Sequence, residues 1–504
     1  MKRNAFIAVF AVMVSFLLVL SGCDQEVETD PNLEITDIAA VVSSAQDLTE
    51  LNKYPNLQKL DLRGSTCYGD IMEYISSHPQ VDVTYDVSLG GEKYGQETAH
   101  LELADGTFTV EELLRTLPYL PELTSVDLPA TTLDFQAITQ IQELFPDIAF
   151  DYTLKINNQT ISPDADSLDL SGLLPEQLDE ILNYLPLLPD VKTIELMDSQ
   201  GQSALGFSDV RKIMDAAPDA FVNYSFELFG NTLSTTDERV EYINTHIGNE
   251  GIDQIREALN IMPNCTYFLM DTCGVDNEVM AQLRDDYQNS TKIVWRVWLV
   301  EEDYSSRLYL RCGSYLTDTH RVRTTYVNDT NSHLLNYCTE TKYLDVGHVW
   351  NLSQCEFISH MPELEVCIIA ITAITDITPL ANHEKLEYLE LFSTDIEDLT
   401  PLESCPNIEH LNISNMPLVK DITPLYSLKK LKRLRMVDSP LIPYDQKVEI
   451  AEVLPDCAML NMGHFPTAWF WRYEDPGKTI KVERYALLCE QMEYTIDALE
   501  YGIP

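Results

Sequence analysis

The chain is poor in basic residues, and this shortage excludes one class of partner. Its 504 residues include 33 Lys and Arg against 81 Asp and Glu, which gives a formal net charge of −48. A surface of this charge repels nucleic acid and anionic lipid headgroups. We therefore expect no nucleic-acid partner. The acidity favours solubility above all, and a cationic partner is the less favoured explanation.

Sequence patterns of common catalytic and metal sites are also missing. The chain contains no H-E-x-x-H, G-x-S-x-G, P-loop or G-x-G-x-x-G pattern. Asp318-Thr319-His320 could contribute to a proton relay, but neighbouring Asp and His are common without catalysis. Residues 164–169 are rich in Asp, but they lack the glycine and the closing glutamate of a calcium loop. We expect no enzyme activity, no metal and no cofactor.

A second long apolar run is absent, so only the N-terminus can engage a membrane through its sequence. Residues 5–20 form an apolar run that follows Lys2 and Arg3 and ends in Leu20-Ser21-Gly22-Cys23. The run of about 16 residues is shorter than the ~20 that a spanning helix usually needs. A basic end, an apolar stretch and small residues are typical of a signal peptide, the alternative being an N-terminal transmembrane helix.

The cysteine at the end of this segment carries a resemblance. Leu20-Ser21-Gly22-Cys23 resembles the lipobox of bacterial lipoproteins. The resemblance implies cleavage after Gly22 and a diacylglycerol group on Cys23. We therefore expect a protein held on the outer face of the cell membrane by lipid alone.

The other ten cysteines give no pairing pattern. Their spacing is irregular, and no C-x-x-C pair occurs. An exported chain permits disulfides, but several of these cysteines fall inside predicted strands, where free buried thiols fit equally well. No disulfide is predicted.

A short repeat occupies the C-terminal part of the chain. Asp376-Ile377-Thr378-Pro379-Leu380 recurs in similar form from Asp398 and from Asp421, at spacings of 22 and 23 residues. An L-x-x-L-x-L strand pattern precedes each copy, and a fourth strand copy and a weaker early one accompany them; the five begin at Tyr343, Leu364, Leu386, Ile408 and Leu431. This period and pattern are the leucine-rich-repeat signature. Stacked units of this kind bury a continuous core beside a parallel sheet.

The Asp-Ile-Thr-Pro-Leu segment resembles the internalin class of bacterial surface proteins. The resemblance covers roughly residues 340–445. One departure is clear: where the family has asparagine after the strand, this chain has Thr372, Thr394 and Ser439, and only one copy has an asparagine, Asn415. Hydroxyl groups can form part of the same hydrogen-bond ladder.

The N-terminal half repeats at a longer period. Its first predicted strands are Leu60-Asp61-Leu62, Val126-Asp127-Leu128, Ile194-Glu195-Leu196 and Phe268-Leu269-Met270, at spacings of 66, 68 and 74 residues. Two more strands follow each of them, near Tyr85 and Leu101 in the first copy and near Val297 and Leu308 in the last. One strand per ~23 residues equals the C-terminal period. A single long solenoid is favoured, and independent α/β modules are the alternative.

These patterns together predict an α/β leucine-rich-repeat solenoid in one or two arrays, with a parallel sheet on the concave face and helices and irregular turns on the convex face. The predicted segments are a signal peptide (1–22), an acidic tether (23–46), degenerate repeats (47–312), an unassigned junction (313–341), internalin-like repeats (342–445) and a last unit with a C-terminal cap (446–504).

Two aromatic clusters need a place in this fold. Trp295-Arg296-Val297-Trp298 alternates as a strand does, so at least one of its Trp side chains should be in the core. Trp469-Phe470-Trp471-Arg472-Tyr473 lies in the predicted cap. A plug that seals the solenoid end is favoured there, and a platform for sugar or peptide is the alternative.

The residues between the strand leucines should lie on the concave face and form the binding site. The candidates are Tyr388, Glu390, Phe392, His410, Asn412, Arg433 and Arg435. The predicted function is a surface-displayed, non-enzymatic and monomeric binding protein for a protein or carbohydrate ligand. The alternative is a cell-envelope enzyme or assembly factor with its site in the junction or the cap.

Overall fold

A computed structural model describes residues 30–494, except 104–105, 129–132, 302–310, 462–465, 468–469 and 476. The predicted signal peptide, Cys23 and Trp469 lie outside the described residues. The chain divides into two compact units, one ending at Phe226 and the other starting at Glu227. Among the described helices, none has the length and apolarity needed to cross a bilayer.

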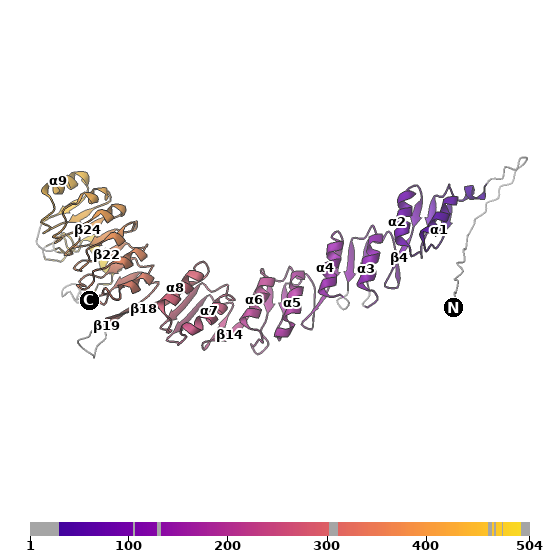
Figure 1. Cartoon of the computed structure of the whole chain (residues 1–504), viewed down its shortest axis with the longest axis horizontal. Coiled ribbons are helices and arrows are strands. Elements are labelled where there is room, and N and C mark those ends of the chain that lie inside the picture. The colour runs from indigo at the N-terminus through magenta and orange to yellow at the C-terminus, as the bar shows by residue number, and fades with distance from the viewer. Residues whose placement is uncertain are drawn as a thin grey trace, which may run out of the picture. The chain divides into compact units, whose positions relative to one another are not determined.

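The first unit consists of three modules, each built on a three-stranded parallel sheet with helices after its strands (Figure 1). The strands are β1 (Asp37–Ala39), β2 (Lys59–Asp61) and β3 (Asp82–Thr84); β6 (His100–Glu102), β7 (Ser125–Leu128) and β8 (Ala149–Tyr152); and β11 (Ser167–Asp169), β12 (Thr193–Glu195) and β13 (Phe221–Asn223). The middle strands contain Leu60, Val126 and Ile194, all fully buried as the alternation predicts.

Three helices of this unit, α1, α3 and α4, begin at a residue whose side chain caps the first turn. At the start of α3, the Thr109 side chain accepts a bond from the Glu112 amide while Glu112 binds back to Thr109, a reciprocal cap that satisfies free amides. The α-helices are α1 (Ala45–Thr49), α2 (Tyr68–Ser77), α3 (Val110–Thr116), α4 (Phe135–Leu144), α5 (Leu178–Tyr184) and α6 (Phe207–Ala216). The 3-10 turns are η1 (Pro31–Glu34), η2 (Glu50–Lys53), η3 (Leu117–Tyr119), η4 (Pro175–Gln177) and η5 (Leu185–Leu187).

A single long solenoid was favoured over independent α/β modules, and the structure shows that the parallel sheet of the N-terminal half is not continuous, because a β-hairpin follows each three-stranded sheet. The hairpins are β4 (Asp86–Leu89) with β5 (Glu92–Gly95), β9 (Leu154–Ile156) with β10 (Gln159–Ile161), and β14 (Ser225–Leu228) with β15 (Asn231–Ser234). The loop Gly90-Gly91 has φ of +62° and +84°, and Asn157-Asn158 has +47° and +62°. Two-residue loops with positive φ at both positions close a hairpin, and this turns the chain out of the parallel sheet.

The second unit opens with a four-stranded sheet. It contains β16 (Arg239–Ile243), β17 (Tyr267–Asp271), β18 (Lys292–Glu301) and β19 (Arg311–Leu316), with β19 antiparallel to β18. The helices are η6 (Asn249–Gly251), α7 (Ile252–Leu259) and α8 (Asn277–Asp286). Trp295 is buried and Trp298 is 44% exposed, which confirms one core tryptophan. The strand predicted at Leu308 lies outside the described residues.

A seven-stranded parallel sheet follows, and it forms the leucine-rich-repeat solenoid (Figure 1). Its strands are β20 (Arg321–Arg323), β21 (Tyr343–Asp345), β22 (Val366–Ile368), β23 (Tyr388–Glu390), β24 (His410–Asn412), β25 (Arg433–Arg435) and β26 (Ala458–Leu460). Return turns join them: η7 (Ser332–Tyr337), η8 (Glu356–His360), η9 (Thr378–Leu380), η10 (Thr400–Ser404), η11 (Thr423–Ser427) and α9 (Tyr444–Val453). The central strand residues Leu344, Leu389 and Leu411 are in register and fully buried.

The junction was wrongly left without a repeat unit, because β20 lies within residues 313–341 and pairs with β21. Arg321-Val322-Arg323 offers only one apolar residue, Val322, which is fully buried at the position of the later leucines. A single inward residue between two arginines is too weak a pattern to indicate a strand by itself.

The repeat turns are built from the residues that the pattern singles out. The Asp398 carboxylate accepts the Thr400 amide at 2.8 Å, and proline occupies the first turn of the following 3-10 helix. Thr372 and Thr394 each donate a hydroxyl bond of 2.7 Å to a strand-end carbonyl. Ser439 donates a hydroxyl bond of 2.8 Å to the Ile413 carbonyl of the preceding repeat. The predicted bond between neighbouring turns is therefore confirmed for Ser439, whereas Thr372 and Thr394 bind within their own repeats.

The nine cysteines whose side chains the structure describes are free thiols. Eight of them are buried and Cys67 is intermediate. Burial raises the pKa of Cys338 and of Cys355 to about 12, so their thiols stay protonated and unreactive at neutral pH.

Candidate binding face of the C-terminal sheet

The predicted binding residues do share one face of the seven-stranded sheet. Tyr388 is paired with His410, and His410 with Arg433. The second column runs through Glu390, Asn412 and Arg435 in the same order. This face was expected to be open to solvent, and that expectation is wrong. Six of the seven candidates are buried, namely Tyr388, Glu390, Phe392, His410, Asn412 and Arg435, and only Arg433 keeps partial exposure.

The chain's own C-terminal segment covers the face. We call residues 470–494 the strap; it contains a bridge between Tyr473 and Lys481 and the helix α10 (Glu483–Gln491). The strap and the sheet bury a common apolar cluster: Val366, Ile368, Ala370, Tyr388 and Phe392 from the sheet side, and Trp471, Val482, Tyr485, Leu488, Cys489 and Met492 from the strap. Trp471 therefore packs on the concave face, whereas a plug at the solenoid end was predicted.

A buried carboxylate lies at the centre of this contact. Glu390 is fully buried and accepts a bond of 2.6 Å from Trp471 Nε1 and one of 3.2 Å from an Arg472 guanidinium nitrogen. The Tyr388 hydroxyl donates a third bond to it. Burial, together with the Glu390 charge, raises the pKa of Tyr388 well above its usual value, so Tyr388 acts as a neutral donor. A buried carboxylate requires such donors to offset its lost hydration.

His410 lies beside this carboxylate cluster as a neutral ring. It stacks on Tyr388 with centroids 6.1 Å apart, and Trp471 meets it edge-on at 6.5 Å. Burial, with the positive charges of Arg484 and Arg433, lowers the pKa of His410 to about 3. Its Nδ1 atom is buried without a hydrogen-bond partner. Protonation of this ring would be opposed both by its burial and by its neighbours.

The sheet also contacts main-chain groups of the C-terminal segment. Arg433 donates a bond of 2.7 Å to the Phe470 carbonyl, and Asn412 donates one of 3.0 Å to the Pro466 carbonyl. At the other edge, Arg321 donates to the Gln491 carbonyl at 3.1 Å. Arginine and asparagine side chains thus bind the carbonyl groups of a peptide, which is a chemistry of peptide recognition.

The edge strands complete the contact with the end of the strap. Arg321 forms an ion pair of 2.8 Å with Glu493. The Tyr494 hydroxyl donates to the Asp345 carboxylate, and the Arg323 guanidinium lies 4.7 Å from the Tyr494 ring centroid. Burial raises the pKa of Asp345. Arg321 and Arg323 were missed as site residues because their strand was not recognised.

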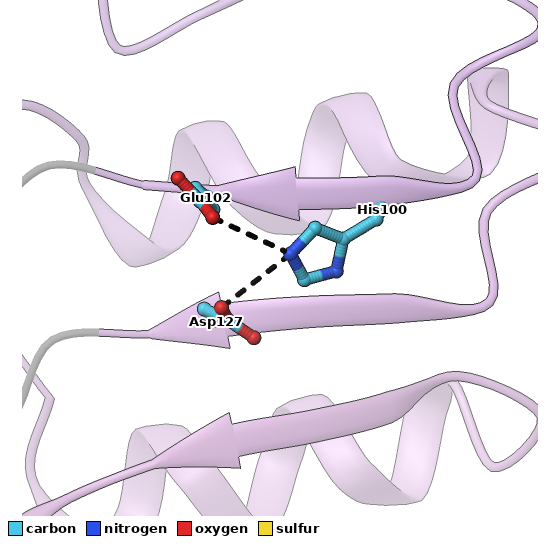
Figure 2. A group of neighbouring side chains, drawn as sticks. All are labelled: His100, Glu102 and Asp127. Atoms are coloured by element: carbon cyan, nitrogen blue, oxygen red, sulfur yellow. Dashed lines mark ion pairs between the residues drawn. The ribbon is translucent and has the colours of Figure 1, made fainter.

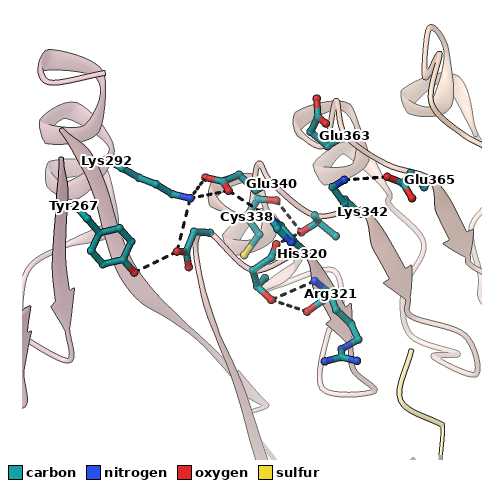
Figure 3. Close-up of polar contacts among 12 residues, drawn as sticks. Tyr267, Lys292, His320, Arg321, Cys338, Glu340, Lys342, Glu363 and Glu365 are labelled. Atoms are coloured by element: carbon teal, nitrogen blue, oxygen red, sulfur yellow. Dashed lines mark hydrogen bonds and ion pairs between the residues drawn. The ribbon is translucent and has the colours of Figure 1, made fainter. Parts of the chain in front are cut away.

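A polar recess of about 380 Å³ lies between α8, β18 and the turn after η7. Figure 3 shows the polar contacts beside it: Lys292 Nζ lies 2.8 Å from Glu340 and 3.8 Å from Asp318, and Tyr267 donates to Asp318 at 3.2 Å. His320 Nε2 lies 3.8 Å from Glu340. Asp318 thus binds Tyr267 and Lys292, and the relay suggested by Asp318-Thr319-His320 is not assembled.

A third group of side chains lies on the first unit (Figure 2). His100 Nε2 lies 3.4 Å from Asp127 and 3.9 Å from Glu102, and His100 Nδ1 lies 2.8 Å from the Ser125 hydroxyl. Their ligand atoms are close enough to reach one metal ion. The side chains are 44–84% exposed, so water competes for every position. No metal was predicted, although strands were predicted at Leu101-Glu102-Leu103 and Val126-Asp127-Leu128, and their parallel pairing joins these residues.

Comparison with known proteins identifies part of the solenoid. Residues 384–427 match the family model described as Leucine Rich repeats (2 copies). This stretch contains β23, β24 and the turns η10 and η11. The match and the parallel sheet show an α/β leucine-rich-repeat solenoid. No curated protein matches the chain.

Several solved structures are similar to the chain at low identity. Internalin C2 of Listeria monocytogenes is 18% identical over 52% of this chain and 87% of its own, with a TM-score of 0.24. An internalin F of the same organism is 13% identical over 86% and 88%, with a TM-score of 0.23. A leucine-rich-repeat protein of Leptospira interrogans is 14% identical over 81% and 91%, with a TM-score of 0.27. Similarity this low carries no information about partners.

Proposed function

We propose that this chain is a non-enzymatic binding protein that a lipid on Cys23 holds on the outer face of the cell membrane. The proposed partner is a protein, which offers a peptide segment to the concave face of the seven-stranded sheet. The lipobox-like Leu20-Ser21-Gly22-Cys23 supports the anchor, and the repeat solenoid supports the binding role, because stacked repeats present extended surfaces for recognition.

One observation supports the peptide class most strongly. The candidate face already contacts a peptide through donors aimed at main-chain carbonyls, namely Arg433 on Phe470 and Asn412 on Pro466. Sugar hydroxyl oxygens accept the same kind of bond, but the segment that occupies this face is a peptide, so a peptide partner has more direct support than a glycan. The enzyme alternative has less support as well, because Asp318 and His320 of the junction bind different partners.

The anchor is tested by metabolic labelling with a clickable fatty acid. The wild-type chain should carry the label and be found in the membrane fraction. The Cys23→Ala variant should carry no label and should leave the membrane fraction. Cys67→Ala is the matched control, since it removes another cysteine and should leave labelling intact. Equal labelling of Cys23→Ala and wild type would exclude the anchor.

The binding role is tested with peptide and glycan arrays probed with the mature chain, followed by cross-linking on intact cells. Peptide hits should compete with the native partner. Tyr388→Ala combined with Arg433→Ala should weaken their binding, whereas Glu387→Ala, an exposed neighbour, should not. Circular dichroism must show that the double variant is folded, because Tyr388 is buried. Hits on glycans alone would contradict the proposed peptide class.

A further inference from the structure

We infer that the strap can leave the concave face of the seven-stranded sheet while the solenoid stays folded. The partner is an amphipathic helix with apolar and polar side chains like those of the strap, and it binds the same face in place of the strap. This inference rests on the proposed function, since it names the partner class of the same site. Four features of the second unit lead to it.

The first feature is that the sheet separates two cores. Along β23, Leu389 points into the solenoid core, while Tyr388 and Glu390 point to the strap. Successive strand residues lie on opposite faces, so departure of the strap uncovers the second core and leaves the leucine core buried. Opening therefore does not require the solenoid to unfold.

The second feature is how the strap is attached. Within the described residues, its bridge joins Tyr473 to Lys481, both in the strap, and it adds no strand to the seven-stranded ladder. Its one α-helix, α10, has nine residues. A helix shorter than about 12 residues is marginal in water by itself. The helix is thus formed on the groove, as in peptides that fold when they bind.

The third feature is the polar character of the buried contact. Glu390, Asp345 and His410 lie under the strap, and the His410 Nδ1 atom has no hydrogen-bond partner there. These groups lose hydration when the strap closes and regain it when the strap leaves. This cost offsets part of the free energy that closure gains by burying apolar side chains. A permanent core is usually more apolar, whereas exchangeable interfaces combine apolar anchors with polar contacts.

The fourth feature defines the partner. Tyr485, Leu488 and Met492 recur at i, i+3 and i+7, the spacing of a helix that presents one apolar face to a groove. Ahead of this helix, Trp471 and Arg472 bring an indole N–H and a guanidinium to Glu390. A competing partner should therefore carry an aromatic–arginine pair followed by an amphipathic helix.

Thiol labelling of the full mature chain tests whether the strap opens alone. Cys489 lies in α10 and belongs to the apolar cluster between the strap and the sheet, whereas Cys367 and Cys405 lie in the solenoid core. Under native conditions, mass spectrometry should show N-ethylmaleimide reacting with Cys489 on the order of 100-fold faster than with the two core thiols. Equal rates for all three would mean that strap and solenoid open together, and this would overturn the inference.

A synthetic peptide of residues 470–494 tests exchange; it and its control both carry Cys489→Ser, so that only the Cys489 thiol of the chain can be labelled. If it takes the place of the strap, it holds the strap open, so the Cys489 labelling rate should rise with peptide concentration and then saturate. The matched control peptide carries Trp471→Ala and Arg472→Ala and should have no effect. A Cys489 rate that the first peptide leaves unchanged, or that both peptides raise equally, would overturn the assigned partner chemistry.

The two proposals fail separately. Neither labelling experiment uses the natural partner. If the strap never opened, the inference would be overturned, but peptides from the array that bind another part of the chain would still support a binding role. An exchangeable strap without any array or cell-surface partner would leave the inference standing and count against the proposed function.

Discussion

The buried Glu390 carboxylate offers the sharpest single test of how the strap is held. Glu390→Gln keeps the shape of the side chain and removes its charge. The three donors around it, from Tyr388, Trp471 and Arg472, then face a neutral amide with one acceptor oxygen. At least one donor is left opposite the amide NH₂ group, and the guanidinium loses its counter-charge.

The size of the effect follows from these contacts. Breaking a fully buried ion pair costs about 3–5 kcal/mol. The Arg472 side chain is 23% exposed and recovers some hydration. We therefore expect the lower end, roughly 3 kcal/mol, which corresponds to about a 100-fold change in the closing equilibrium. The loss should appear in strap closure, because Glu390 does not enter the leucine core.

Native-state hydrogen exchange measures this equilibrium directly. In Glu390→Gln the amides of α10 should exchange about 100-fold faster, while those of β23 and β24 should change little. Glu403→Gln, at an exposed residue in the turn η10 of the same repeat, is the control. Adding Arg472→Met to Glu390→Gln should recover part of the loss, because it removes the uncompensated charge. A difference below about 0.5 kcal/mol between Glu390→Gln and its control would refute the account.

Three further predictions concern the solenoid core, acid and the thiols. Leu411→Ala should lower the free energy of global unfolding by about 2–5 kcal/mol in urea titrations, because Leu411 is fully buried in the stack; a loss no larger than that of exposed Glu387→Ala would contradict the repeat register. The pKa of His410 is about 3 in the folded chain against 6.5 unfolded, so its stabilising contribution is complete above pH 6.5 and is lost as the pH falls towards 3. Thermal melts should show a loss of roughly 2 kcal/mol at pH 5 that His410→Gln lacks, and an unchanged pH slope in the variant would exclude His410 as its source. Asp345, whose pKa burial raises, opposes this trend, so both melts are best repeated in Asp345→Asn. Titration with a thiol-specific disulfide reagent at pH 8 should reach Cys67 first, while Cys338 and Cys355 should react only after denaturation; early reaction of Cys338 would contradict its burial.

Repetition made the solenoid predictable. Each unit near residues 376, 398 and 421 forms its strand and turn from contacts within itself and with the next copy. The same local rules apply in each copy, so Leu389 in the core and the Asp398 turn could be predicted from the spacing alone. The hydroxyl bonds of Thr372 and Thr394 to the ends of their own strands follow from the same repetition.

Two local features were missed, and only the first was open to prediction from the sequence. The loops Gly90-Gly91 and Asn157-Asn158 are two-residue turns of the type that closes hairpins, so they indicated where each ladder ends. The strand Arg321-Val322-Arg323 had a weaker pattern, with one apolar residue between two charges. The first error arose because the strand period was extended past the hairpin turns, and the second because a strand with a single apolar residue was not recognised.

The state of the binding face was decided by tertiary structure alone. The sequence determined that Tyr388, Glu390 and His410 share one face, because strand alternation is a local property. It did not determine that this face is covered, since Trp471 and Glu390 are separated by 81 residues and the strap occurs only once. A segment without repeats leaves no period to extend, and its position follows only from the apolar groove and the buried carboxylate that accept it.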